Sequence, residues 1–387
     1  MSNPDLYKSM GINFMQVLNA YIPTRLKFID RTWMAFGMVI GLLLIVQSPA
    51  RSINWGKSVL RQQPEWYGSA EAQAAADNVL VYQSKFGAWP KNWNLLAPIT
   101  TEALEKLNKG GKANTIDNSA TIMPMRFLAL VYQSSPDEKY RTAFNRGVNY
   151  LLDSQYSNGG FPQFFPLRVN KYHSRITYND GAMIHALEML SDVAKGQAPY
   201  DLVEAKLRAK AVTSVERGID CILKTQIRQD GKLTAWCAQH DQKTLEPAWA
   251  RSYEPPSLSG AESVGVVHFL MSIEEPTPEI VVAIEGAVAW FRSVAMKGVR
   301  LESARRDDGR KERWLAPDPD ASPLWARFYE LGTNRPLYLD RDSVFRYDFT
   351  EISYERRSGY SYHGTWAAKL LADGYPRWRE KHRLPKE

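Results

Sequence analysis

The sequence has few of the features that define small disulfide-rich proteins, zinc proteins and nucleic-acid-binding proteins. Its 387 residues include only two cysteines, Cys221 and Cys237, which are too few for a disulfide scaffold or a zinc site. No stretch is rich in lysine and arginine, and no nucleic-acid-binding motif is present. We therefore expect no nucleic-acid partner. The two cysteines either form one disulfide or stay free and buried, and we favour free thiols.

Long hydrophobic runs are scarce as well. An uncharged apolar run covers residues 33–46, whereas a membrane-spanning helix needs roughly 20 apolar residues. Basic residues precede the run and small residues follow it, which is typical of a signal peptide. We predict that residues 1–50 are a signal peptide, or alternatively an uncleaved membrane anchor, and that residues 51–64 are a linker. Residues 65–387 would then form one domain in a secreted or periplasmic protein.

Few segments show the alternating pattern of β-strands. Apolar residues instead recur at helical spacing over residues 203–223 and 278–294. A short pattern also repeats: Gln83, Gln155 and Gln226 lie 72 and 71 residues apart, each between a helical segment and a glycine-containing turn. Helix pairs repeated in this way predict a mostly α fold, an α/α toroid (an incomplete α/α barrel) with long functional loops at one mouth.

Charge and aromatic content indicate the class of ligand. The net charge is +7, and aromatic residues make up 12% of the chain. A basic protein suits a polyanion, and aromatic rings offer stacking surfaces to sugars, although a large core also uses such rings. An acidic polysaccharide is therefore a candidate ligand.

A long loop is predicted at residues 234–260. It has neither a helical nor a strand period, and it contains Pro247, Pro255 and Pro256. Its aromatic residues argue against disorder, and ordered loops of this length are usually functional. We expect Arg251 to lie at the centre of a site for a polar, ring-shaped ligand.

Two acidic stretches each precede a helical run. Asp117 and Asn118 come before residues 123–133, and Asp180 comes before residues 182–190. These side chains either cap the helices or point into one cavity, where carboxylate and amide oxygens are suitable ligands for Ca²⁺.

Arginines among aromatic residues form a fourth candidate stretch. Arg327 and Arg341 lie in a segment with Trp325, Tyr329 and Tyr338. An arginine fork binds a carboxylate with two hydrogen bonds. The alternative is a surface network of ion pairs with the acidic residues at 340, 342 and 351.

Five longer stretches resemble a known family. They are NGGFPQFFP from residue 158, ITYNDGAM from 176, TAWCAQHD from 234, ARSYEPPSLSGAES from 250 and WARFYELGTNRPLYLDRD from 325. Over roughly residues 65 to 380 the chain resembles the family 10 polysaccharide lyases, which are pectate lyases. The resemblance implies an α/α toroid and a Ca²⁺-dependent enzyme. It would cleave α-1,4-linked polygalacturonate (pectate) by anti β-elimination, giving 4,5-unsaturated oligogalacturonates.

The resemblance also implies roles for individual residues. Asp117 and Asp180 would bind Ca²⁺, and Arg251 would be the base. The substrate would be held by Asn118, Trp249, Tyr253, Arg327 and Arg341.

An arginine base requires a special environment. Arginine normally keeps its proton, with a pKa above about 12, so the site must lower the pKa of Arg251, for instance through Ca²⁺ and neighbouring arginines. This predicts an alkaline pH optimum. The alternative base is His240 or Tyr253.

Two other functions stay open on the sequence alone. Asp117 and Asp180 could be the two carboxylates of a glycoside hydrolase on the same scaffold, roughly 5 to 9.5 Å apart. The chain could also be an inactive pectate-binding protein. Calcium dependence and an unsaturated product would distinguish the lyase. We expect a monomer that contacts a membrane only if residues 1–50 are not cleaved.

Overall fold

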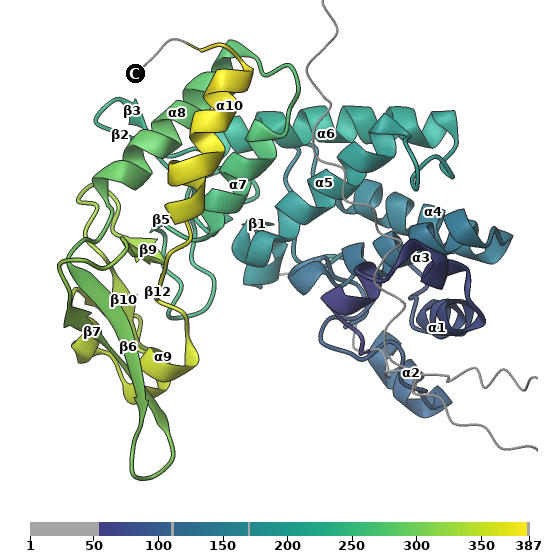
Figure 1. Ribbon diagram of the computed structural model, residues 1–387, viewed down its shortest axis with the longest axis horizontal. Helices are drawn as coiled ribbons and strands as arrows, with labels where there is room; N and C mark the ends of the chain where they lie inside the picture. Colours follow the sequence, from purple (N-terminus) through teal and green to yellow (C-terminus); the bar gives the residue numbers. More distant parts are fainter. Residues whose placement is uncertain (1–53, 110–111, 169–170, 385–387) are drawn as a thin grey trace, which may run out of the picture. The chain divides into compact units, whose positions relative to one another are not determined.

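The computed structural model describes residues 54–109, 112–168 and 171–384 (Figure 1). The apolar run at 33–46, and with it the predicted signal peptide or anchor, lies outside the described residues. Among the helices that are described, none combines the length and the apolar character that crossing a membrane requires.

Helices packed in consecutive pairs make up most of the described fold. Helix α3 packs on α4, α5 on α6 and α7 on α8. Contacts also run through α1, α4, α6 and α8 in order, and through α3, α5 and α7 in order, so the pairs contribute to two layers. The mostly α fold is thus confirmed, and closure into a toroid stays a prediction. The bounds are α1 Ala70–Val81, α2 Thr101–Lys109, α3 Ile122–Ser134, α4 Glu138–Ser154, α5 Ala182–Lys195, α6 Ala205–Thr225, α7 Glu262–Met271, α8 Pro278–Ser293, α9 Tyr354–Gly359 and α10 Tyr375–Lys381.

The helices predicted from apolar periodicity are present. Residues 203–223 correspond to α6 and residues 278–294 to α8. Helix α8 begins after Thr277, whose side chain accepts a hydrogen bond from the Ile280 backbone, and Pro278 fits the first turn. Its apolar residues at helical spacing are buried in the main core.

The three repeated glutamines each connect two helix pairs. The side-chain amide donates one hydrogen bond to a carbonyl in its own turn and one to a carbonyl in a helix of the next pair. The acceptors are Gly87 and Ala143 (α4) for Gln83, Gly159 and Ser214 (α6) for Gln155, and Thr234 and Ala283 (α8) for Gln226, all at 2.8 to 2.9 Å. The regular spacing in the sequence therefore reflects a structural repeat.

A second, smaller hydrophobic core lies under the loops that follow α8. Aromatic residues dominate it, and β6 (Val299–Arg305) and β7 (Lys311–Pro317) form an antiparallel hairpin whose Leu301 and Leu315 pack against it. Its buried members are Tyr253, Phe328, Leu337, Tyr338, Leu339, Phe349, Ile352 and Tyr362.

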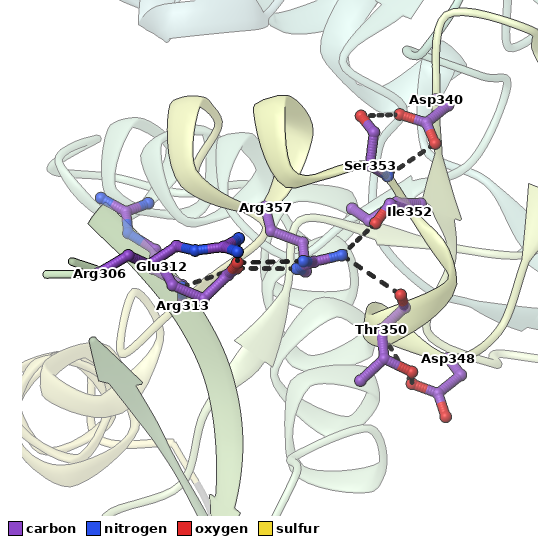
Figure 2. Close-up of polar contacts among 9 residues, drawn as sticks. All are labelled: Arg306, Glu312, Arg313, Asp340, Asp348, Thr350, Ile352, Ser353 and Arg357. Carbon is purple, nitrogen blue, oxygen red and sulfur yellow. Dashed lines mark hydrogen bonds and ion pairs between the residues drawn. The ribbon is translucent and has the colours of Figure 1, made fainter. Parts of the chain in front are cut away.

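Polar contacts fix the segment beside this second core (Figure 2). Arg357 of α9 donates two hydrogen bonds to Glu312 of β7, at 3.0 and 3.2 Å, and others to the backbone carbonyls of Thr350 and Ile352. Asp340 accepts hydrogen bonds from the backbone and hydroxyl of Ser353. Helix α9 is therefore tied to both the hairpin and the loop at Asp340.

Two-residue strands connect the loops of the chain. Because each pair joins segments distant in sequence or closes a tight turn, the loops are ordered. The antiparallel pairs are β1 (Ile176–Thr177) with β4 (Gln239–His240), β2 (Arg228–Gln229) with β3 (Lys232–Leu233), β5 (Leu258–Ser259) with β9 (Phe328–Tyr329), β8 (Trp325–Ala326) with β12 (His363–Gly364), and β10 (Tyr338–Leu339) with β11 (Phe345–Arg346).

Two further features bear on the sequence predictions. The described part of the predicted linker is packed: two 3₁₀ helices, Lys57–Leu60 and Pro64–Gly68, contact α3, and Val59 is fully buried. Cys221 and Cys237 are free and buried, as favoured above. Burial raises the pKa of Cys221 to about 12, which makes its thiol unreactive.

Candidate active site

Two equivalent turns form one side of the candidate site. Asp117–Ser119 and Asn179–Gly181 are short 3₁₀ turns that precede α3 and α5 and contact each other. Their central residues, Asn118 and Asp180, both adopt the left-handed conformation, with φ of 51° and 53°, which Asn and Asp tolerate better than most residues. The turns therefore hold corresponding positions in two repeats.

The two turns carry Asp and Asn in opposite order, Asp117-Asn118 in one and Asn179-Asp180 in the other. Asp117 and Asn179 are the buried members of the two turns, and Asn118 and Asp180 are the exposed ones. Neither α3 nor α5 receives a capping hydrogen bond from the side chain at its N-cap, which is Thr121 or Gly181. The helix-capping interpretation of the acidic residues is therefore wrong.

Asp117 is buried with only half of its carboxylate satisfied. Its side chain is 2% exposed, and its Oδ2 pairs with the ammonium group of Lys91. Its Oδ1 is buried without a hydrogen-bond partner. A buried carboxylate oxygen without a partner is costly, so this atom suits a cation.

Asp180 lies among charges of both signs. Partial burial of its carboxyl group raises its pKa, Glu262 and Asp117 raise it further, and Arg327 and Arg251 act in the opposite direction. These effects indicate that the four groups lie near Asp180, and the turn of Asp117 contacts that of Asp180. The structure thus brings both predicted metal ligands together with two of the predicted arginines.

The donor set fits a Ca²⁺ ion that is shared with substrate. Asp117 and Asp180 offer carboxylate oxygens, which Ca²⁺ prefers. Within the described ranges, however, no group of three or more His, Cys, Asp or Glu side chains is arranged to hold a metal. Water and substrate oxygens would have to complete the coordination, and the metal site stays a prediction.

Arg251 is held by Glu254 through one edge of its guanidinium group. Nε donates to Oε2 at 2.7 Å, Nη2 pairs with Oε1, and the Arg251 backbone also donates to this carboxylate. The side chain of Glu254 is only 6% exposed, whereas that of Arg251 is 41% exposed. Burial lowers the pKa of Arg251, but Glu254 outweighs it, so the pKa is raised overall. In this state Arg251 is protonated, contrary to the lowered pKa that a base requires.

The rings around Arg251 serve different purposes. Tyr253 is 5% exposed, and the guanidinium groups of Arg251, Arg341 and Arg356 lie 4.3 to 5.4 Å from its ring centre. It therefore supports arginines through cation–π contacts and offers little free face to a sugar. Trp249 is partly exposed at the edge of the second core and keeps a surface for stacking.

Arg327 is fixed by a buried carboxylate. It pairs with Glu262 and donates through Nε to the Ser361 carbonyl at 2.9 Å. The two side chains are 14% and 3% exposed. Glu262 is not among the predicted site residues, although the spacing Ser259-x-x-Glu262 resembles a capping box. The Glu262 backbone does donate to the Ser259 hydroxyl, but the N-cap of α7 is Ala261.

Arg341 is the most exposed of the three predicted arginines. Its side chain is 64% exposed, and it reaches Glu355 at 3.2 Å. Glu355 also holds the buried Arg356. Because both side chains of this pair are exposed, the pair is weak and leaves Arg341 available to a substrate carboxylate.

His240 is not a base. It is completely buried, and both ring nitrogens are hydrogen-bonded to the backbone of Cys237 and Leu245. Burial lowers its pKa to about 4. The alternative assignment of His240 is therefore wrong, and the histidine instead holds the loop that leads to Arg251.

Comparison with known proteins identifies the family. Residues 83–371 match the sequence model of a family described as pectic acid lyase. The chain belongs to this family. The lyase is also similar to the solved structure of a family 10 polysaccharide lyase from Cellvibrio cellulosa, with 39% identity and a TM-score of 0.70 over 82% of this chain and 95% of that one. A mutant of that family 10 lyase, in complex with trigalacturonic acid, matches at 40% identity and a TM-score of 0.69, over 80% and 95% of the two chains.

These matches confirm a pectate lyase of polysaccharide lyase family 10. Among curated proteins no match is found. The hydrolase and the inactive binding protein are accordingly not supported. The site of the lyase also contains three charged residues that the sequence analysis did not select, namely Lys91, Glu254 and Glu262.

Proposed function

We propose that the lyase cleaves polygalacturonate by Ca²⁺-dependent β-elimination at the site formed by the two turns and the three arginines. The observation that carries this proposal is the placement of Asp180 within electrostatic reach of Arg251 and Arg327, with the turn of Asp117 in contact with that of Asp180. A negatively charged sugar chain needs cations for its carboxylates, and these arginines lie near Asp180, whose carboxylate suits Ca²⁺. The relative in complex with trigalacturonic acid supports the same substrate class.

The chemistry requires removal of the weakly acidic proton next to the uronate carboxylate. Bound Ca²⁺ would neutralise that carboxylate and the negative charge that develops on it. Arg327, fixed by Glu262, supplies a preorganised positive charge for the same purpose. Arg341 has the exposure to bind a second uronate carboxylate, and Asn118 and Trp249 have exposed surface facing solvent for the sugar hydroxyls and ring.

Arg251 is our candidate for the base. The family resemblance supports this, and so does the edge of its guanidinium that Glu254 leaves unoccupied. Because Glu254 raises the pKa of Arg251, the neutral form is populated only at high pH or when the charge of bound ligands opposes Glu254. The proposal therefore predicts a rate that rises with pH on the alkaline side.

The test follows the unsaturated product in the ultraviolet with polygalacturonate as substrate. We expect activity that is lost in EDTA and restored by added Ca²⁺. Asp180→Ala should lose about a hundredfold or more of kcat per folded molecule at saturating Ca²⁺. Its stability should fall by only about 1 to 2 kcal/mol, because Asp180 caps no helix and the loss is that of an alanine in the left-handed conformation. Undiminished activity in EDTA, or in Asp180→Ala, would exclude this metal site. The remaining parts of the proposal, namely the toroid, a monomer and secretion, are tested by an experimental structure, by sedimentation and by fractionation.

A further inference from the structure

Lys91 places a positive charge on one of the two predicted calcium ligands. Its ammonium group pairs with Asp117 Oδ2, while Asp117 Oδ1 has no partner. No motif or periodic pattern in the sequence points to Lys91, and none of the proposed chemistry uses it. Within the described part of the chain, no other lysine forms an ion pair with Asp117.

The local structure holds Lys91 at this position. Two residues earlier, the backbone of Trp89 donates to the Thr121 hydroxyl at 3.2 Å, and Thr121 in turn donates to the Thr115 carbonyl at 2.7 Å. The Trp89 ring is fully buried. These bonds join the turn that carries Lys91 to the segment that carries Asp117, so the backbone of Lys91 is held within side-chain reach of Asp117.

We propose that Lys91 is an internal cation that competes with Ca²⁺ for Asp117 and thereby weakens metal binding until substrate is present. The inference rests on the calcium site of the proposed function. A divalent ion that coordinates both Asp117 and Asp180 would lie within a few ångströms of the ammonium group, and like charges at that distance repel strongly.

The ammonium group of Lys91 can also move away from Asp117. Its side chain is 34% exposed, and the four-carbon stem of lysine is flexible. The carboxylate of an incoming uronate offers the ammonium group another partner. Metal binding and substrate binding would therefore be coupled, because substrate both contributes oxygens to the metal and removes its competitor.

The test measures Ca²⁺ binding directly, by isothermal titration of chelator-treated protein without substrate. The Lys91→Met variant removes the charge and nearly preserves the shape of the side chain. We expect it to bind Ca²⁺ about tenfold or more tightly than the wild type. Lys91→Arg, which keeps a cation, should stay close to the wild-type affinity. Lys91→Gln provides a second uncharged variant if Lys91→Met does not fold.

Two controls separate the possible outcomes. Lys85→Met changes the net charge equally at an exposed lysine that lies over Phe86, so it should leave the affinity unchanged. Asp117→Asn should abolish binding. If Asp117→Asn loses Ca²⁺ but the uncharged Lys91 variants match the wild type or bind more weakly, the calcium site stands and the competition is overturned. If the wild type and the uncharged Lys91 variants bind Ca²⁺ only after trigalacturonate is added, the competition is overturned and the metal site stands. If none of them binds Ca²⁺ even with trigalacturonate, both fail.

Discussion

At the scale of single residues, Arg251 and Glu254 behave as one unit. Glu254 accepts hydrogen bonds from the backbone and from two side-chain nitrogens of Arg251, and a further one from the Tyr360 hydroxyl at 2.9 Å. The carboxylate is buried and fully used. It thus fixes the plane of the guanidinium group and determines which nitrogen faces the substrate, at the expense of a raised pKa for Arg251.

Replacing Glu254 should reveal whether Arg251 is the base. Glu254→Gln keeps the shape but removes the negative charge that raises the pKa of Arg251. The pKa should fall, so the alkaline limb of the kcat profile should move to lower pH, on the order of one pH unit. The plateau value of kcat should fall about ten- to a hundredfold, because the charge-assisted orientation is weakened. The measurement is kcat against pH at saturating substrate and fixed free Ca²⁺.

The matched control for this variant is Glu246→Gln, which changes an exposed glutamate of the same loop. Its profile should coincide with that of the wild type. A limb that stays in place in Glu254→Gln would show that the titrating group is not Arg251, which would then be a carboxylate clamp. His240 would not become the base in that case, because it is buried and bonded on both sides.

Some of the site residues could be predicted from the sequence and others could not. Asp117, Asn118 and Asp180 were selected because they precede helical runs, and the structure brings them together in two adjacent turns. Lys91 and Glu254 gave no such signal. The pair of Lys91 with Asp117 is a tertiary contact across 26 residues of sequence, and the pair of Glu254 with Arg251 is local but lies inside a loop without periodicity.

At the scale of elements, the glycines after the repeated glutamines have different tasks. Gly159 and Gly231 occupy corresponding turns and both have positive φ, 89° and 75°. A Cβ on Gly159 would lie 1.9 Å from the Arg217 carbonyl oxygen of α6, whereas nothing lies within 4 Å of a Cβ on Gly231. The first turn therefore needs glycine for contact as well as conformation, and the second only for conformation.

An alanine at each position should separate these two costs. Gly231→Ala should lower the free energy of unfolding by about 1 to 2 kcal/mol, the cost of a left-handed alanine. Gly159→Ala should cost about 2 kcal/mol more, because α4 and α6 must move apart. Urea denaturation measures both, and activity per folded molecule should be kept in Gly231→Ala. Equal losses in the two variants would mean that the close approach of α6 does not constrain this turn.

The elements that the sequence missed are those without apolar alternation. Helices α6 and α8 bury one face and were predicted within about two residues. The hairpin of β6 and β7 is mostly exposed or half-buried and rich in charged residues, so its period-2 pattern is limited to the short stretch from Val299 to Glu302. The two-residue strands that join the loops are shorter than any pattern that sequence periodicity can detect.

At the scale of the whole molecule, the site combines two different supports. The turns with Asp117 and Asp180 belong to helices of the main core, and Tyr253 beside Arg251 belongs to the second core. Short strand pairs such as β5 with β9 bring the loop of Arg251 to the segment of Arg327. The sequence predicted the two acidic turns and the arginines as site residues. Their proximity depends on strand pairs between loops, which no local sequence pattern encodes.

The charge of the whole molecule should act on the rate of substrate capture. The net charge is +7, and polygalacturonate is a polyanion, so long-range attraction should increase the association rate. Added NaCl shortens the Debye length from about 10 Å at 0.1 M to about 3 Å at 1 M. We therefore expect kcat/KM on polygalacturonate to fall about tenfold or more between low and high salt at constant free Ca²⁺ activity. The value of kcat should change little, because Arg327 and its buried partner are shielded from the solvent ions.

Highly methyl-esterified pectin, which lacks the free carboxylates, should be cut slowly and with little dependence on salt. If kcat falls together with kcat/KM, the arginine contacts themselves are being screened. If methyl-esterified pectin shows the same salt dependence as polygalacturonate, the attraction does not act on the carboxylates of the substrate.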